Sequence, residues 1–409
     1  MIGVHRKDTP YPTRLKIEHT NFCNSQCIMC SHYFSNNANA KMVDDCLEER
    51  ITSLLLHVKR VLLHGSGEPL LHPHITEYIE RYASMGIDVT CNTNLSIMTS
   101  ELACAINKAF KKISVSCDGS TAKIFEGIRQ GLDFQKFVDN LKLLRRMCPT
   151  LIIKIYTVVL RQNIMQLPEI VKFAHQTGCD SMVITDLNPK EILGNEKDMV
   201  RNYPAVTKRF LREALEVASK LQFIVDYPRY LLELPNVRDY DIEIRMMEEM
   251  TLFPDREFQK KLQAFYKTLK LKTYSVRADL NTFMSMSGYH CIGICNYLME
   301  EPYIDVNGEV FPCCANGQYN IGNIYEQEFE DIWDNEYYRS LRKLFSEGEI
   351  PNYCKGCLYL RNHYLGDVEV LDIDDDFYRH QYNVDMESLT GQFKDFCERW
   401  DETDGEIVG

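Results

Sequence analysis

The sequence predicts an α/β fold in which a partial (β/α)6 barrel is followed by a small cysteine-rich domain made of a β-hairpin and a helix. The barrel is predicted because short β-rich runs alternate with amphipathic helical segments between residues 14 and 186. The second domain is predicted because cysteines gather again after residue 288, around an Asn-Gly pair that is typical of a tight hairpin.

Each element of the barrel has its own signal. Strands are expected where β-branched residues gather, over 14–20, 58–65, 87–93, 110–116, 151–159 and 181–187. Helices are expected where apolar residues recur at helical spacing, over 46–56, 75–86, 100–109, 134–147 and 167–178. Such alternation produces parallel strands, and barrels of this kind place their active site at the C-terminal ends of the strands.

After residue 190 the alternation stops. Two long charged helices are expected within 197–221 and 245–271, with a short strand candidate at 223–227 between them. The predicted divisions of the chain are an N-terminal extension, the barrel, a helical insertion that closes the barrel, the cysteine-rich domain and an acidic tail, over 1–13, 14–200, 201–287, 288–365 and 366–409.

Composition and charge exclude several classes of protein. The net charge is −13, and the segment from Gly366 onward carries 14 acidic and 3 basic residues, so we expect a solvated acidic tail. The nearly neutral remainder does not resemble a nucleic-acid-binding surface, and no apolar run reaches the roughly 20 residues that span a bilayer. Sixteen cysteines without an export signal indicate a cytoplasmic protein that uses thiols for metal or redox chemistry.

Cys23, Cys27 and Cys30 form a C-x3-C-x2-C pattern just after the first expected strand. A structural zinc site needs four protein ligands and usually pairs C-x2-C knuckles. A disulfide framework needs an even number of cysteines and an oxidising compartment. Three thiolates on one loop suit a four-iron cluster whose fourth iron stays open for a small molecule.

These cysteines, together with three later segments, resemble the radical SAM superfamily. HGSGEP at 64–69 resembles the Gly-Gly-Glu-Pro segment of the family, CNTNL at 91–95 resembles Thr-Asn-Gly, and SVSCDGS at 114–120 resembles Ser-x-Asp-Gly. The resemblance implies a TIM-like partial barrel that binds S-adenosylmethionine (SAM) at the open iron. It also implies reductive cleavage of SAM to a 5′-deoxyadenosyl radical, with a flavodoxin- or ferredoxin-type protein as the electron donor.

The resemblance also implies roles for individual residues. The expected SAM contacts are Met29, Ser66, Gly67, Glu68, Asn94 and Ser116. Asp118 is expected to face the barrel interior, and Cys117 is a candidate hydrogen donor to a substrate radical. The histidines near the second loop, His64, His72 and His74, suit turn and capping roles better than zinc binding.

A second group of cysteines predicts a closed site with four thiolates. The expected ligands come from the hairpin and from a later C-x2-C knuckle, and they are Cys295, Cys313, Cys354 and Cys357. Their spacing alone leaves a structural zinc ribbon open. The region resembles the SPASM extension of radical SAM enzymes in its shorter "twitch" form, with a spacing similar to that of the aminocyclitol dehydrogenase of butirosin biosynthesis. That resemblance implies one auxiliary 4Fe-4S cluster, with Cys291 and Cys314 as alternative ligands.

The functional expectation is a radical SAM oxidoreductase with two 4Fe-4S clusters, in which the auxiliary cluster accepts the electron of the substrate radical. Only 13 residues precede the first expected strand, which favours a small polar substrate such as a sugar or aminocyclitol over a peptide. The alternatives are a peptide-modifying (RiPP-maturing) enzyme, a redox-neutral epimerase, a non-catalytic iron–sulfur electron carrier and a zinc-binding interaction protein.

Overall fold

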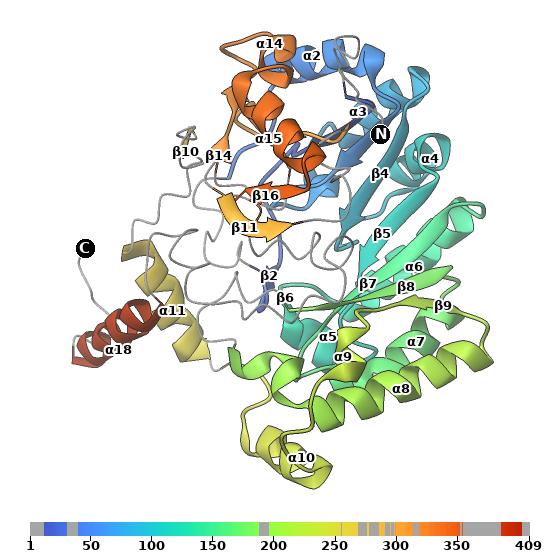
Figure 1. The fold of residues 1–409 in the computed structure, drawn as a ribbon. Helices are drawn as coiled ribbons and strands as arrows, with labels where there is room; N and C mark the ends of the chain where they lie inside the picture. Colours follow the sequence, from blue (N-terminus) through green and yellow to red (C-terminus); the bar gives the residue numbers. More distant parts are fainter. Residues whose placement is uncertain are drawn as a thin grey trace. The chain divides into compact units, whose positions relative to one another are not determined.

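A computed structural model describes most of the chain, over residues 12–30, 40–187, 196–254, 256–268, 276–277, 286–290, 295, 298, 300–313, 319–351, 354 and 386–402. Its elements fall into two compact units, each built from segments that are distant in the sequence (Figure 1). Unit 1 comprises Met1–Phe22, Ala40–Thr90 and Lys272–Met386, and unit 2 comprises Cys23–Asn39, Cys91–Leu271 and Glu387–Gly409. Each unit combines segments from several of the domains predicted from the sequence, so the two divisions cannot be compared boundary by boundary. The predicted domain boundaries therefore remain predictions.

The sheet of unit 1 is centred on β1 (Arg14–Ile17). This strand pairs in parallel with β3 (Arg60–Leu63) on one edge and with β12 (Tyr303–Ile304) on the other. From β12 the chain returns antiparallel as β13 (Glu309–Phe311), which pairs with β15 (Gly322–Asn323). Gly308 has a φ of +74°, which confirms the predicted Asn-Gly turn between β12 and β13.

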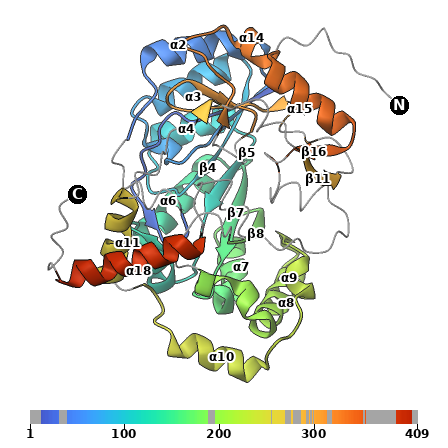
Figure 2. The ribbon, with the colours of Figure 1, turned by 60° about the vertical axis from the view of Figure 1, so that its left-hand side comes forward.

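Helices and short strand pairs complete unit 1. Its helices are α2 (Asp45–Leu54), α3 (Ile75–Ser84), α14 (Phe329–Trp333) and α15 (Glu336–Ser346). Its short strand pairs are β10 (Val276–Arg277) with β14 (Tyr319–Asn320), and β11 (Met286–His290) with β16 (Glu349–Pro351). Figure 2 shows α14 and α15 from a second direction. The single helix predicted for the cysteine-rich domain is divided into α14 and α15, and Asn335 is the N-cap of α15.

The boundary between the units falls within β4 (Asp88–Thr93), because Thr90 belongs to unit 1 and Cys91 to unit 2. Its parallel strands, in spatial order, are β4, β5 (Lys112–Ser116), β7 (Ile152–Val159), β8 (Ser181–Asp186) and β9 (Ile224–Asp226). All six strands predicted for the barrel are confirmed as β1, β3, β4, β5, β7 and β8, and β9 confirms the strand candidate. The mostly parallel α/β sheet is the one typical of a partial TIM barrel.

Five helices of unit 2 alternate with these strands along the chain. They are α4 (Ser100–Ala109), α5 (Ala122–Ile128), α6 (Phe134–Met147), α7 (Leu167–Gln176) and α8 (Pro204–Lys220). Strand β7 alternates between fully buried residues, such as Ile153 and Ile155, and half-buried residues, such as Lys154 and Tyr156. One face of the sheet therefore forms the hydrophobic core, and the other stays partly accessible.

The helices after the barrel differ from their prediction: α8 begins only at Pro204, after two 3-10 turns at Glu196–Asp198 and Val200–Asn202. The segment expected to be one long helix over 245–271 is divided into α10 (Tyr240–Glu249) and α11 (Arg256–Thr268). Pro254 lies between them, and a proline prevents the residue before it from continuing a helix. A shorter helix, α9 (Tyr230–Glu233), precedes α10. Within the described part of the chain, no helix has the length and apolar character needed to cross a membrane.

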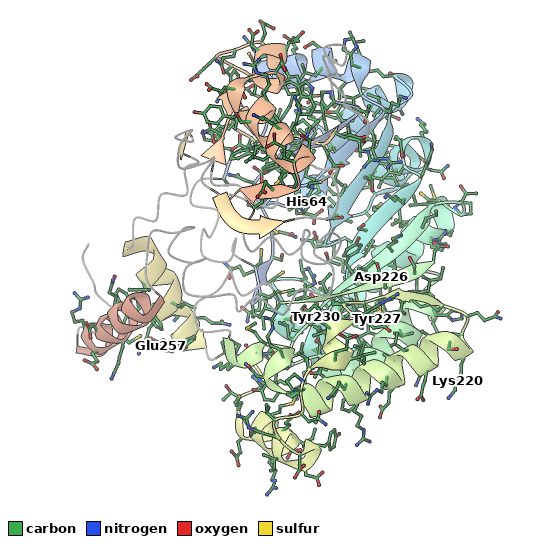
Figure 3. All side chains as sticks on the ribbon, in the orientation of Figure 1. His64, Lys220, Asp226, Tyr227, Tyr230 and Glu257 are labelled. Carbon is green, nitrogen blue, oxygen red and sulfur yellow. The ribbon has the colours of Figure 1, made fainter. Side chains whose placement is uncertain are left out.

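The acidic tail is not solvated throughout. Residues Met386–Glu402 form helix α18, and the ring centroids of Phe393 and Phe265 on α11 lie 5.1 Å apart. Phe396 is only 2% exposed, and Trp400 Nε1 donates a hydrogen bond of 3.2 Å to Glu257 of α11, which is labelled in Figure 3. Aromatic residues at helical spacing therefore anchor this part of the tail, and the excess of acidic residues concealed that signal.

Candidate active site

The loop that carries Cys23, Cys27 and Cys30 is fixed by pairing with a distant segment. Strand β2 (Gln26–Cys27) pairs antiparallel with β6 (Arg129–Gln130), which follows α5. Gly131 has a φ of +88°, and a Cβ there would lie 3.0 Å from the Asn24 carbonyl oxygen. Glycine therefore lets the chain turn close against the cysteine loop.

The thiols of this loop suit an iron–sulfur cluster. The Ser25 hydroxyl lies 3.2 Å from Cys23 Sγ and 3.4 Å from Cys27 Sγ, so both sulfurs lie beside the same hydroxyl. A four-iron cluster binds each thiolate at a different iron, so its ligands need not meet at one point. The donor set thus fits a cluster.

An apolar layer surrounds the cysteine loop. Cys27 and Met29 are each 7% exposed and pack with residues from several elements, namely Ile28, Ile124, Ile128, Leu160, Leu187 and Met199. Such a shell limits access of water and controls the potential of an enclosed metal site. Met29 lies within this layer, and its predicted contact with the adenine of SAM remains a prediction.

A buried ion pair lies against the loop. Arg129 Nη2 is 2.7 Å from Asp118 Oδ2, and Arg129 Nη1 is 3.7 Å from Cys27 Sγ. Burial acts to lower the pKa of Arg129, but the Asp118 carboxylate raises it above its usual value, so the guanidinium stays charged. No motif in the sequence indicates Arg129 as a site residue. An arginine directly after an apolar helical turn was the available signal, but surface arginines often occupy such positions.

Ser116 at the end of β5 and Cys117 directly after it differ in burial. Cys117 is fully buried, and its thiol donates a 3.3 Å hydrogen bond to the Gly119 carbonyl oxygen. Burial raises the pKa of this thiol to about 12, so it remains protonated at neutral pH. Ser116 is half-buried on the accessible face of β5. The predicted roles of Ser116 in SAM binding and of Cys117 as a hydrogen donor remain predictions.

Asn94 lies directly beside the cysteine loop. Its Nδ2 atom is 3.1 Å from Asn24 Oδ1 and 3.8 Å from Cys23 Sγ. Leu95, which stands where the family has glycine, still adopts the left-handed backbone, with a φ of +53°. This conformation costs roughly 1 kcal/mol for a residue with a Cβ. The side chain of Leu95 is fully buried and its carbonyl accepts a 2.9 Å bond from Asn140, contacts that offset this strain.

The turn at residues 65–69 belongs to unit 1 and packs against the backbone that leads to Cys23. A Cβ at Gly67 would lie 2.4 Å from the Thr20 carbonyl oxygen and 2.6 Å from that of Phe22. Glu68 donates a 2.8 Å backbone hydrogen bond to the Phe22 oxygen, and its carboxylate accepts from Leu70 N at 3.2 Å. Only glycine fits at position 67, as the motif predicts.

Ser66 of the same turn contacts a carboxyl that the sequence analysis missed. Its hydroxyl donates a 2.7 Å hydrogen bond to Glu18 Oε1. Glu18 is 4% exposed, and burial raises its pKa. A charged residue directly after a buried strand was the signal that could have identified Glu18.

A further missed residue is Gln162, in the loop after β7. It is 4% exposed, and within the described part of the chain neither atom of its side-chain amide has a hydrogen-bond partner. Buried amides are normally paired. A polar group of a bound cofactor would satisfy this amide, so the loop is suited to receive one.

Of the histidines considered for zinc, His72 is buried in unit 1, His64 is half-buried and His74 is exposed. Burial lowers the pKa of His64 to about 3 and that of His72 to about 4, so both are neutral at physiological pH. His72 Nε2 is 3.3 Å from the Val43 carbonyl oxygen, and His72 Nδ1 accepts from the His74 backbone. These contacts agree with the turn and capping roles that the sequence indicates.

The second group of predicted ligands is described only in part. Cys295 is buried, whereas Cys313 and Cys354 are half-buried, and all three belong to unit 1. Cys357 and the alternative ligands Cys291 and Cys314 lie outside the described residues. The four-thiolate ligand set therefore remains a prediction.

Comparison with known families identifies two domains in this chain. The model of the radical SAM superfamily matches residues 17–174, and the model of the SPASM iron–sulfur cluster-binding domain matches residues 295–358. The chain is a radical SAM enzyme with a SPASM domain. SAM and iron–sulfur clusters are thus supported as its cofactors, and the resemblance drawn from the motifs is confirmed.

Relatives of this radical SAM enzyme differ in what they do. The AdoMet-dependent heme synthase of Methanosarcina barkeri is 25% identical over 360 residues, which cover 86% of this chain and 90% of the relative. The probable GTP 3′,8-cyclase of Methanocaldococcus jannaschii is 26% identical over 223 residues, which cover 50% of this chain and 74% of the relative.

Solved structures support the fold of this radical SAM enzyme. The structure of anSMEcpe with bound AdoMet and Cp18Cys peptide has a TM-score of 0.54 at 15% identity and covers 97% of this chain and 100% of that chain. BtrN in complex with AdoMet and 2-DOIA has a TM-score of 0.37 at 16% identity, covering 82% of this chain and 87% of that chain.

Proposed function

We propose that this radical SAM enzyme is an oxidoreductase that removes a hydrogen atom from a small polar substrate, with one auxiliary 4Fe-4S cluster accepting the remaining electron. The observation that carries the proposal is the cysteine loop, in which Cys27 and Cys30 pack in an apolar layer, Cys23 lies four residues before Cys27, and the backbone is fixed by β2 and β6. When bound and reduced by a flavodoxin- or ferredoxin-type donor, the first cluster and SAM supply a 5′-deoxyadenosyl radical.

The residues around the loop have distinct tasks in this proposal. Cys23, Cys27 and Cys30 hold the first cluster. The turn of Ser66, Gly67 and Glu68 packs against Thr20 and Phe22, and its backbone groups and carboxylate suit the amino group of SAM. The remaining predicted SAM contacts are Met29, Asn94 and Ser116. The apolar layer excludes water, which protects a reactive radical from side reactions.

The accessible face of unit 2 supports a small polar substrate. The parallel register aligns Ser114 with Lys154 and Ser116 with Tyr156, and all four side chains are half-buried. Hydroxyl and ammonium groups on one face can hydrogen-bond a polyol or an amine. The names of two relatives, a heme synthase and a probable GTP cyclase, also refer to small molecules.

The proposal is tested by replacing Cys23, Cys27 and Cys30 together with Ala. We expect reductive formation of 5′-deoxyadenosine to be abolished, because no other group is proposed to hold the first cluster. The measurement is chromatographic quantification of 5′-deoxyadenosine after anaerobic reduction with dithionite. Replacement of Cys46 and Cys104, which are both exposed, by Ala is the matched control. Undiminished 5′-deoxyadenosine in the triple variant would rule out the assignment.

The role of the auxiliary cluster requires a second variant, in which Cys295, Cys313, Cys354 and Cys357 are replaced by Ala. We expect this variant still to form 5′-deoxyadenosine but to lose oxidised product, because only the fate of the substrate electron depends on the second cluster. Circular dichroism must first show that the variant is folded, since metal binding can stabilise a small domain. Product formation at the wild-type rate would favour a redox-neutral epimerase.

A peptide substrate is the main alternative. The solved complex of anSMEcpe contains a peptide, although its likeness to this chain concerns the fold alone. Incubation with sugars, aminocyclitols and candidate peptides, each followed by mass spectrometry, distinguishes the two classes. SAM-dependent modification of peptides only would overturn the small-molecule proposal while leaving the radical SAM assignment intact.

A further inference from the structure

We propose that Arg129, anchored by Asp118, is a positioning residue that raises the reduction potential of the cluster on Cys23, Cys27 and Cys30 through its contact with Cys27 Sγ. This inference rests on the proposed function, because it assumes that Cys27 is a thiolate ligand of that cluster.

Backbone and side chain both direct Arg129 to this sulfur. The register of β2 and β6 aligns Cys27 with Arg129, so the two residues are held opposite each other by the backbone. The guanidinium Nη1 atom then lies 3.7 Å from Cys27 Sγ, within the range of a hydrogen bond to sulfur. Arg129 is 7% exposed, so little solvent screens its charge.

The anchor of the guanidinium is itself held by β7. One oxygen of Asp118 accepts a 2.8 Å hydrogen bond from Val158 N, and the other lies 2.7 Å from Arg129 Nη2. Asn163 Nδ2 donates a 3.1 Å bond to the Asp118 carbonyl oxygen. Asp118 is therefore fixed from two sides and has little freedom to release the arginine.

The energetics of the pair argue for a role beyond stability. Removing two charges from water is unfavourable for each ion, and a buried ion pair is often no more stable than an apolar replacement. Here the pair is placed against a predicted cluster ligand. Reduction adds one electron to the cluster, with no bond formed or broken, and an N–H donor with a positive charge favours the more negative reduced state.

The test measures the reduction potential of the reconstituted full-length protein by redox titration with electron paramagnetic resonance. The first cluster is identified as the one whose signal changes when SAM is added, because SAM binds its open iron. We expect Arg129→Gln to lower the ratio of reduced to oxidised cluster about tenfold at a fixed potential, equivalent to about 59 mV for one electron. Arg129→Lys, which keeps the charge, should give a smaller change.

The matched control is Arg145→Gln. Arg145 also pairs with an aspartate, Asp180, at 2.7 Å, but this pair lies beside the N-terminal end of β7, where Asp180 accepts a bond from Ile153 N. Its removal should leave the potential unchanged. The same shift in the control and in Arg129→Gln would show a nonspecific effect and would overturn the proposal.

Arg129→Gln leaves Asp118 buried without its partner and can impair folding. The double variant Arg129→Gln/Asp118→Asn replaces the ion pair with a neutral pair of similar shape, and we expect its potential also to fall. A wild-type potential in the double variant, or a folded variant that binds no cluster, overturns the proposal. A SAM-responsive signal that persists without Cys23, Cys27 and Cys30 would instead contradict the proposed function.

Discussion

Single buried residues determine how this protein responds to pH. Glu18 is almost completely buried beneath the turn at residues 65–69, and burial is the main cause that raises its pKa above the ordinary value of 4.5. The hydrogen bonds from Ser66 and from the Val306 backbone oppose this effect, and the carboxyl of Asp305 adds to it. Folding therefore favours the protonated carboxyl.

The pH dependence of stability tests this environment. Because the pKa of Glu18 is raised in the folded state, its stabilising contribution is complete below pH 4.5 and is lost as the pH rises through the folded-state pKa. Glu18→Gln keeps an acceptor for Ser66 but cannot ionise. We expect the variant to gain free energy of unfolding relative to wild type as the pH rises above 4.5, measured by urea unfolding of the apo-protein.

Glu49→Gln, at an exposed position of α2, is the control for this experiment and should show no such trend. A difference between wild type and Glu18→Gln that stays constant from pH 4 to pH 8 would contradict the buried-carboxyl interpretation.

The residues of the sequence motifs could be predicted from the sequence. The residues that contact them from distant parts of the chain could not. The spacing of Cys23, Cys27 and Cys30 and the turn at Gly67 carry local signals. Arg129 contacts Cys27 across 102 positions of sequence, and no local pattern reports that contact. Leu95 departs from the expected glycine, yet the structure retains the left-handed backbone there, because tertiary burial outweighs a small local strain.

Among the elements, the turn between β3 and α3 has little tolerance for added volume at Gly67. It runs against the carbonyl oxygens of Thr20 and Phe22, and Glu68 begins the short 3-10 helix Pro69–Leu71 with its own carboxylate as the cap. These contacts connect the second strand of the barrel to the backbone that enters the cysteine loop.

Gly67→Ala should therefore disturb cluster loading. A Cβ at this position would overlap two backbone oxygens, and overpacking of this kind typically costs about 1–3 kcal/mol. We expect a lower melting temperature and a reduced iron content after reconstitution, measured by calorimetry and by a colorimetric iron assay.

Gly391→Ala in α18 is the matched control, since a Cβ there meets no atom within 4 Å. Full iron content in Gly67→Ala would show that the turn adapts without affecting the loop.

Element type was readily predictable, whereas element ends and breaks were less so. The helices α4 and α6 begin and end where the periodicity indicates, with Thr99 and Asp133 as N-caps. The break between α10 and α11 was not predicted, because the long periodic pattern outweighed the signal of the single residue Pro254. Helix α18 was missed because acidic residues outnumber the aromatic residues that anchor it to α11.

At the scale of the whole molecule, cysteines from two distant parts of the chain are expected to hold separate clusters. The matches to the radical SAM and SPASM models span 17–174 and 295–358, so each predicted ligand group lies within its own domain. The pairing of β1 with β12 had no signal in the sequence, because long-range strand pairing depends on contacts that no local periodicity reports.

Metal analysis of the whole protein tests the number of clusters. After anaerobic reconstitution we expect about eight irons per chain, as two four-iron clusters, and a brown colour. The triple variant without Cys23, Cys27 and Cys30 should retain about half of that iron. A content near four irons together with bound zinc in the wild-type protein would mean that the SPASM region holds zinc, and the auxiliary cluster would be withdrawn.

The position of β1 also affects how the protein is made. One edge of β1 pairs with β3, which is synthesised soon after it, but the other edge must wait for Pro302 and Ile304, whose carbonyl oxygens accept from Lys16 and Glu18. At the usual rates of translation, that edge stays unpaired for roughly 15 to 60 s. An exposed strand edge can pair with another chain, so nascent copies growing on one message are the first candidates for such mispairing. Slower initiation, which spaces the ribosomes further apart, should therefore increase the yield of folded protein.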